Sequence, residues 1–516
     1  MLFACIYVPE FPAQAIARAT PELREQAMAV LDGTPPILTV IAANSRAREF
    51  GINIGMTKLQ AEACPHVHLR RRSLLEEDAA NAALLDCAHA FSPRVENTNR
   101  CSPDCKKPGD TVILDISGLE RLFGPPPDIA RDLTSCVSTM GLDANVAVAS
   151  NPDVAMHAAH GFSGVTVIAS GRESERIGAL PIYVLGASDD MLETFERWGI
   201  RDFGGLAALP EVALSQRLGQ EGLRLQKLAQ GCTQRTLVPT EPAIQFEEGI
   251  ELEDAIELLE PLAFVLNGLL EQICTRLASR ALAAHELRLT LELAGHEDES
   301  VEEQKQSKRI YQRSLHFPVP MQDRRTFLKL LQLDLAAHPP DGAVKKILIA
   351  ARPAPPRFAQ SGLFLPRGPA PERLELTLAR IRGIVGEDRV GSAELLDTHA
   401  PGAFRMHAFQ PYLVGRKKNK TQPREQRAAL RIFRPPLEAK VRLTNGVPAR
   451  VFLRGQAHQV TAAAGPWRNN GGWWTEQAWT RDEWDLELRA EQSSPMLVRA
   501  YRDFSSAKWY VESSFD

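Results

Sequence analysis

Short apolar runs alternate with longer amphipathic segments in the N-terminal part of the chain. Residues 2–8 and 112–116 are almost wholly apolar, rich in β-branched residues and too short for helices, so they predict buried strands. Helical spacing follows at residues 126–140 and again from Pro152, with Asn151 placed as an N-cap. The pattern predicts strands and helices that share one core.

The middle of the chain changes character. Residues 178–240 alternate short helices with glycine-containing turns. An acidic segment, residues 247–260, is expected to be rich in helix and to lead into a helix over 261–280. Residues 286–294 and 344–350 alternate apolar and polar positions and predict strands of an antiparallel sheet.

The C-terminal part begins with a proline-rich stretch, residues 351–371, which reads as an extended linker. An amphipathic helix over 371–384 follows, and residues 416–434 form a basic stretch that is either a nucleic-acid contact or a charged linker. Residues 440–502 contain several period-two runs. Six of the seven tryptophans lie in residues 437–516, which favours a small β-rich module that binds another protein.

Composition limits the classes of protein. A length of 516 residues predicts several domains, and a net charge of −4 means that local basic clusters must carry any nucleic-acid binding. No apolar run is long enough for a membrane span, and the N-terminus lacks the basic region of a signal peptide. Eight scattered cysteines are typical of reduced thiols, so we expect a cytoplasmic protein.

One strand and turn carry the first resemblance. Residues 110–124, DTVILDISGLERLFG, resemble the palm motif of Y-family (translesion) DNA polymerases, in which an adjacent Asp and Glu bind two metal ions. Asp110 keeps the first acid, Thr111 replaces the Glu, and Asp115 matches a structural aspartate of that motif. The fold class implied is an α+β multidomain chain with palm, fingers, helix-hairpin-helix thumb and little finger.

The fingers motif is the most specific signal in the chain. Residues 40–65 keep the family pattern in register at ten positions, Asn44, Ala47, Arg48, Gly51, Ile52, Gly55, Met56, Ala61, Cys64 and Pro65. Agreement over that length is far beyond chance. The resemblance therefore covers the fingers as well as the palm.

The polymerase site itself departs from the family at nearly every position that handles metal or triphosphate. Val8 stands where the first strand should end in a metal-binding aspartate. Arg48 is kept, but Ser45 replaces its tyrosine partner at the triphosphate. Pro152 and Met156 replace two lysines. The site is therefore interpreted as degenerate, and neither a bound metal nor a cofactor is expected.

Two later segments suggest contacts with DNA. Residues 198–210 resemble part of a helix-hairpin-helix thumb, in which turn amides such as those of Gly199, Gly204 and Gly205 meet phosphates. The little finger offers a further basic set, although a solvated face would also explain it. That set is Lys305, Lys308, Arg309, Arg313, Arg324 and Arg325.

A pentapeptide in the proline-rich linker resembles the bacterial clamp-binding motif Q-x-x-L-F. Gln360, Leu363 and Phe364 would present one amide and two apolar anchors to a preformed pocket. Neighbouring prolines reduce the ordering cost. The motif follows directly after the predicted little finger, which strengthens the assignment.

The complete arrangement resembles non-catalytic Y-family relatives that act as the hub of bacterial DNA-damage-induced (SOS) mutagenesis. That resemblance implies binding to DNA, to the sliding clamp (the DNA polymerase III β subunit), to an error-prone C-family DNA polymerase and to ImuA, a RecA-like protein. The implied domains are a palm (1–30 and 75–170), fingers (31–74), a thumb (171–243), a little finger (244–352), a linker with the clamp motif (353–371), a helix and basic linker (372–436) and a C-terminal interaction module (437–516).

Two alternatives stay open at this point. One is an active translesion polymerase with an altered metal site, in which Glu10 or Asp115 completes the ligands. The other is a helix-hairpin-helix DNA-binding or nuclease subunit, which would explain the thumb but not the fingers motif.

Overall fold

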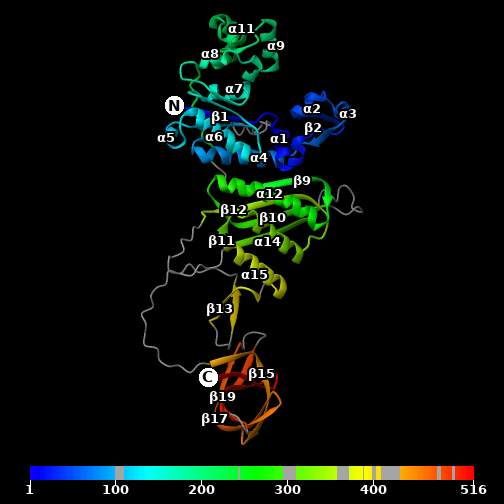
Figure 1. The fold of residues 1–516 in the computed structure, drawn as a ribbon, viewed down its shortest axis with the longest axis vertical. Helices are drawn as coiled ribbons and strands as arrows, with labels where there is room; N and C mark the ends of the chain where they lie inside the picture. Colours follow the sequence, from blue (N-terminus) through cyan, green and yellow to red (C-terminus); the bar gives the residue numbers. More distant parts are fainter. Residues whose placement is uncertain are drawn as a thin grey trace. The chain divides into compact units, whose positions relative to one another are not determined.

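The computed structural model describes residues 1–98, 110–241, 245–294, 309–356, 371–386, 389–397, 403–407, 430–472, 478–490 and 494–515. The chain forms two compact units, Met1–Glu387 and Asp388–Asp516 (Figure 1). In the part of the chain that the structure describes, no helix has the length and hydrophobicity of a membrane span.

A five-stranded sheet of order β5-β6-β1-β7-β8 organises the first unit. Its strands are β1 (Phe3–Tyr7), β5 (Val95–Asn97), β6 (Thr111–Asp115), β7 (Asn145–Ala149) and β8 (Val165–Val167). The central strand β1 runs antiparallel to both β6 and β7, so that Tyr7 lies opposite Thr111 and Asn145. The strands predicted at residues 2–8 and 112–116 are confirmed.

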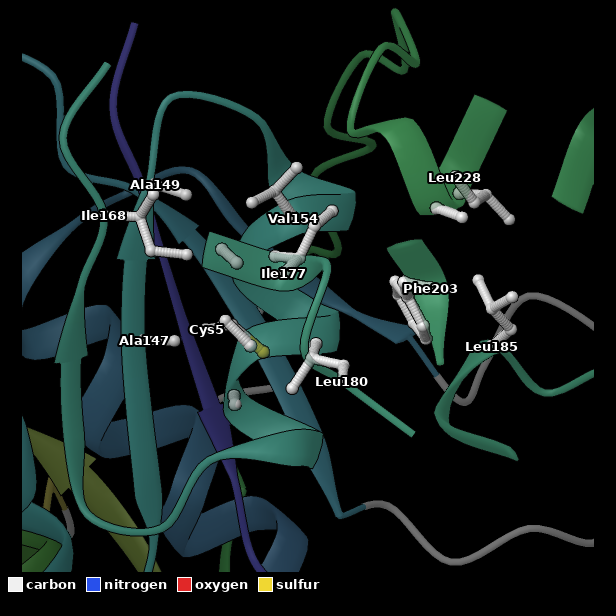
Figure 2. Close-up of a cluster of buried hydrophobic side chains, with 14 of the residues drawn as sticks. Cys5, Ala147, Ala149, Val154, Ile168, Ile177, Leu180, Leu185, Phe203 and Leu228 are labelled. Atoms are coloured by element: carbon white, nitrogen blue, oxygen red, sulfur yellow. The ribbon is translucent and has the colours of Figure 1, made fainter. Parts of the chain in front are cut away.

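Helices cover both faces of this sheet, with α4 and α6 on one face and α7 on the other (Figure 1). They are α1 (Phe11–Ala19), α4 (Leu74–Phe91), α5 (Glu120–Phe123), α6 (Pro126–Thr139) and α7 (Pro152–Gly161). The predicted cap is present, since the Asn151 side chain accepts a hydrogen bond from the backbone N–H of Asp153. In Figure 2, Cys5 and Ala147 from the sheet lie beside Val154 of α7 within one buried cluster.

The fingers contain a small three-stranded sheet of order β3-β2-β4 with two short helices. Its elements are η1 (Pro21–Glu25), β2 (Ala27–Thr34), β3 (Ile37–Ala43), α2 (Ser45–Glu49), α3 (Lys58–Glu62) and β4 (Val67–Arg71). Asn44 caps α2 by accepting from the N–H of Ala47. Gly51 and Gly55 both have φ of +89°, which explains why the fingers motif requires glycine at these turns.

The thumb is a set of short helices that extends the buried cluster of Figure 2 through Leu185, Phe203 and Leu228. It comprises α8 (Glu173–Ile177), η3 (Ile182–Leu185), α9 (Asp189–Arg197), α10 (Phe203–Ala207) and α11 (Glu211–Gln230). The long helix α11 breaks at Gly219, whose φ is +63°. Short helices separated by glycine turns are what the sequence predicts here.

The little finger is a four-stranded antiparallel sheet of order β11-β10-β12-β9 with helices packed on its core. Its elements are β9 (Phe246–Ile256), α12 (Leu259–Ser279), β10 (Ala283–Leu293), β11 (Ile310–Met321), α14 (Arg324–Ala337) and β12 (Val344–Ala354). The predicted strands at 286–294 and 344–350 are confirmed.

The helix-rich reading of residues 247–260 is wrong, because most of this segment is strand β9. Phe246, Glu248 and Ile250 alternate into the interior at period two. The pattern is hidden in the sequence because one inward position is a glutamate, which is buried only through ion pairs with distant arginines.

Helix α15 (Pro371–Val385) belongs to the first unit and packs on the little-finger core through Leu376 and Ala379. The helix predicted at residues 371–384 is confirmed, but it packs on the little finger rather than lying in a connecting segment. A hairpin of β13 (Ser392–Leu395) and β14 (Phe404–His407), which the sequence did not predict, begins the second unit.

A closed six-stranded barrel makes up most of the second unit. Its strands are β15 (Leu430–Thr444), β16 (Val447–Leu453), β17 (Gln456–Gly471), β18 (Trp479–Arg489), β19 (Met496–Asp503) and β20 (Trp509–Phe515). The predicted β-rich module is therefore a barrel, and it begins at Leu430 rather than at residue 437. Closure leaves no free sheet edge.

Candidate active site and its altered ligand positions

Val8 lies at the rim of the palm sheet, directly after β1, where a Y-family enzyme would hold metal. Its backbone N–H donates to the Asp110 carbonyl at 2.8 Å, which joins the two ligand positions through the main chain. The Val8 side chain is fully buried in the palm core. An aliphatic side chain in that position provides no metal ligand.

Thr111 is hydrogen-bonded on both sides. Its hydroxyl donates to Asp110 Oδ1 at 2.8 Å and lies 3.0 Å from His160 Nε2. The His160 ring in turn stacks on Tyr7, with ring centroids 3.9 Å apart. Burial, followed by the nearby Asp110 carboxylate, raises the pKa of Tyr7, so this phenol stays neutral. His160, on α7, thus contacts both Thr111 and Tyr7 at the rim of the sheet. The sequence did not indicate this residue.

Glu10, the acid proposed to complete the metal site, is directed toward the fingers. It has a left-handed backbone (φ +50°, ψ +41°) at the start of α1. Its carboxylate accepts from the N–H of Ala43 at 3.1 Å and pairs with the Arg48 guanidinium. The one arginine kept from the triphosphate motif is therefore neutralised within the chain.

Asp115, the second replacement acid, lies at the far end of β6. It is opposite Phe3, whereas Thr111 is opposite Tyr7, so about 13 Å of strand separates the two ends. Its carboxylate binds Arg94 at 2.7 Å and accepts from the N–H of Ser117 at 3.0 Å. Asp115 has the structural role that the motif gives it and is too far away to join Asp110.

The other positions that the resemblance assigns to the nucleotide carry no cationic side chain. Ser45 is the first residue of α2, Pro152 is buried in the first turn of α7, and Met156 packs against the palm and thumb core. Among the described residues, no group of three or more His, Cys, Asp or Glu side chains could hold a metal ion. Two-metal phosphoryl transfer requires carboxylates that bridge ions about 4 Å apart.

The thumb glycines engage their N–H groups inside the thumb. Gly199 donates to Glu196 O at 2.9 Å, and Gly204 donates to Gly178 O at 2.8 Å. Gly205 donates to the Asp202 carboxylate at 2.8 Å. Phosphate contacts by these amides would have to replace bonds that already exist.

The predicted basic set of the little finger is partly paired. Arg313 binds Asp334 at 2.6 Å and Arg324 binds Glu271 at 2.5 Å. Lys305 and Lys308 lie outside the described residues, as does the clamp motif of Gln360, Leu363 and Phe364. Of the C-terminal tryptophans, Trp484 is part of the barrel core and Trp467 is 46% exposed.

A buried ionic network joins the palm to the little finger, and no sequence motif indicates it. Arg18 on α1 donates two hydrogen bonds of 2.7 Å to Glu248 on β9. Arg276 on α12 bonds to Glu248 at 3.0 Å and to Asp86 on α4 at 2.8 Å. Burial alone would raise the pKa of Glu248, but Arg18 and Arg276 hold it below its usual value.

The mixed palm sheet, the fingers inserted after β1 and α1, and the thumb and little finger that follow define a Y-family polymerase-like fold. Val8 and Thr111 lie at the rim of its sheet, at the positions that the motif resemblance assigns to metal-binding acids. Residues 6–160 match the sequence model of the impB/mucB/samB (IMS) family.

Two relatives in sequence agree with this class. Protein ImuB of Caulobacter vibrioides is 26% identical over 410 residues, which cover 77% of this chain and 82% of that protein. DNA polymerase IV of Dehalococcoides mccartyi is 26% identical over 283 residues, or 53% of this chain and 69% of that protein. The crystal structure of DinB from Sulfolobus solfataricus aligns with a TM-score of 0.40 at 16% identity, covering 69% of this chain and all of that one. The chain is ImuB-like, and the resemblance stated from the motifs is confirmed.

Proposed function

We propose that this chain is a non-catalytic scaffold in DNA-damage-induced mutagenesis and translesion synthesis. The observation that carries the proposal is the rim of the palm, where a buried valine and a hydrogen-bonded threonine occupy the ligand positions. The pairing of Glu10 with Arg48 supports it, because the kept triphosphate arginine already has an anionic partner. Similarity to Protein ImuB of Caulobacter vibrioides agrees with this role.

The scaffold binds the sliding clamp through Gln360, Leu363 and Phe364 and recruits an error-prone C-family polymerase and ImuA to damaged DNA. The C-terminal unit is the proposed region for these protein partners, and the protein acts in the cytoplasm. Support for the clamp contact comes from the motif and its position after the little finger.

Primer extension with the purified full chain tests the non-catalytic role. The assay supplies a primed template, all four dNTPs and either Mg²⁺ or Mn²⁺, beside an active Y-family polymerase as positive control. We expect no extension. Extension that disappears in Asp110→Ala would overturn the proposal and establish the active-polymerase alternative.

Capture on immobilised sliding clamp tests the scaffold role separately. The double variant Leu363→Ala and Phe364→Ala should lose capture, because two apolar anchors are removed. A matched double variant in the same linker, Arg357→Ala and Arg367→Ala, should keep it. Equal capture by all three proteins would contradict the assignment of the motif.

A further inference from the structure

One row of side chains on the barrel places two arginines directly opposite each other. Arg442 of β15 lies directly opposite Arg450 of β16, and Arg450 lies opposite Gln459 of β17. Gln459 in turn lies opposite Arg489 of β18. The row therefore crosses four neighbouring strands, a span of about 14 Å.

The alternation of each strand places this row on the outside of the barrel. Val451 and Leu488, the neighbours of Arg450 and Arg489, are buried in the barrel core. All three arginines are exposed, and so is Lys440, which flanks the row on β15. Arg442 also lies over the ring of Phe452, 5.7 Å from its centroid.

Elsewhere on the same barrel, several arginines lie opposite carboxylates. Arg468 of β17 faces Asp482 of β18 at 2.7 Å, and Arg499 of β19 faces Asp485 of β18 at 2.8 Å. Like charges placed directly opposite on adjacent strands destabilise a sheet, whereas opposite charges stabilise it. Barrel stability therefore explains the arginine–carboxylate pairs, but it does not explain the facing arginines of the Arg442 row.

No carboxylate compensates the row within the described part of the chain. None of Lys440, Arg442, Arg450 and Arg489 is joined to an acid there. The nearest acid on β18, Glu487, accepts instead from the Thr461 hydroxyl at 2.6 Å. The facing residues of β17, Ala457 and Gln459, are uncharged.

The sequence before β15 and through β16 has the same sign of charge as the row. Residues 416–454 contain twelve Lys and Arg and two Glu, in a chain whose net charge is −4. A concentrated basic segment in an acidic chain is a local electrostatic footprint rather than a general property of the protein.

We propose that the outer face of β15–β18 binds the phosphodiester backbone of DNA, with Arg442, Arg450 and Arg489 as its cationic row. Arginine suits phosphate oxygens because its planar donors form paired hydrogen bonds. Gln459 adds a neutral donor between them. This surface recognises the charge of the DNA backbone and not its base sequence. It holds the second unit on DNA independently of the scaffold role proposed above.

Fluorescence anisotropy of the full chain with a labelled oligonucleotide tests this surface, with single-stranded and duplex DNA as separate arms. The variant Arg442→Ser with Arg450→Ser should weaken binding about tenfold at ~0.1 M salt. It should also reduce the slope of log K against log salt by about 1.4 for single strands or about 1.8 for duplex. The arm with the larger loss identifies the form of DNA held.

Matched controls separate this contact from net charge and from unfolding. Arg468→Ser with Arg499→Ser removes the same charge from arginines that have acidic partners, and it should leave DNA affinity near that of the wild type. The Arg442 and Arg450 variant should melt no lower than the wild type, because a like-charged pair is removed.

Three results would overturn the proposal. The first is an unchanged salt slope in the Arg442 and Arg450 variant, and the second is an equal loss of affinity in the control variant. Loss of binding to anionic phosphatidylglycerol vesicles without any loss of DNA binding would likewise count against it. Clamp capture by Leu363 and Phe364 is unaffected by these substitutions, so failure here leaves the scaffold role standing.

Discussion

The guanidinium of Arg48 in the fingers pairs with the carboxylate of Glu10 in the turn after β1. Arg48 follows the capped start of α2, and Glu10 is held by the N–H of Ala43. The Glu10 carboxylate therefore pairs with the arginine that, in the fingers motif, binds the triphosphate. Glu10 is therefore an internal anionic partner of Arg48.

Glu10→Gln should therefore release Arg48 for an anionic ligand. We expect the affinity for a nucleoside triphosphate to rise about fivefold, which corresponds to about 1 kcal/mol. Titration with a fluorescent triphosphate in the absence of divalent metal measures this change. The double variant Glu10→Gln with Arg48→Gln is the control and should show no gain, and equal affinity in wild type and Glu10→Gln would refute the prediction.

Arg276→Met should destabilise the first unit strongly. Its side chain is 1% exposed, and its removal leaves Glu248 and Asp86 buried with less charge compensation. Breaking a buried pair from one side costs about 3–5 kcal/mol. Urea unfolding measures the loss.

Arg224→Met provides the comparison for that experiment, since Arg224 pairs with Glu221 at the surface and should cost no more than about 1 kcal/mol. Equal midpoints for the two variants would mean that the buried network does not stabilise the contact between palm and little finger.

Glu76 should make the stability fall as the pH rises. Burial raises the pKa of Glu76 to about 8, the Glu251 carboxylate adds to the shift, and Arg70 opposes it. Because the folded pKa lies above the unfolded one, the folded state holds a proton that the unfolded state releases. Stability is therefore lost progressively between about pH 4.5 and about pH 8.

Glu76→Gln should remove that loss. Its free energy of unfolding, measured relative to the wild type, should increase by on the order of 4 kcal/mol between acidic and mildly alkaline pH. Chemical unfolding at several pH values checks this. A constant difference between the two proteins across the range would show that Glu76 does not titrate in the predicted window.

The fold could be predicted from the sequence wherever short-range patterns determine the local structure. The apolar run of β1, the Asn151 cap and the glycine turns of the fingers each follow from short-range chemistry, and the structure has them in place. The prediction failed at β9, where Glu248 is inward-facing only because Arg18 and Arg276 reach it from elsewhere in the chain. Long-range pairing has no local signature.

The same distinction applies to the candidate site. Val8 and Thr111 were identified from their positions in the motif. His160 was not, because its approach to Thr111 depends on how α7 packs on the sheet. The partner of Arg48 was also missed, since a lone glutamate after a strand does not reveal which cation it meets.

Thr111→Glu should not restore a polymerase, although it recreates the adjacent acids of the palm motif. Val8 still offers no ligand, and Arg48 remains paired with Glu10. Thr111 is 2% exposed, so an added carboxylate should also cost about 1–3 kcal/mol by leaving a polar group poorly solvated. Primer extension with Mg²⁺ and Mn²⁺, together with a thermal melt, measures both effects. The isosteric variant Thr111→Gln separates charge from size. Primer extension by Thr111→Glu but not by Thr111→Gln would contradict this prediction. It would mean that the threonine alone inactivates an otherwise intact polymerase site. The Glu10–Arg48 pair would then not prevent triphosphate binding.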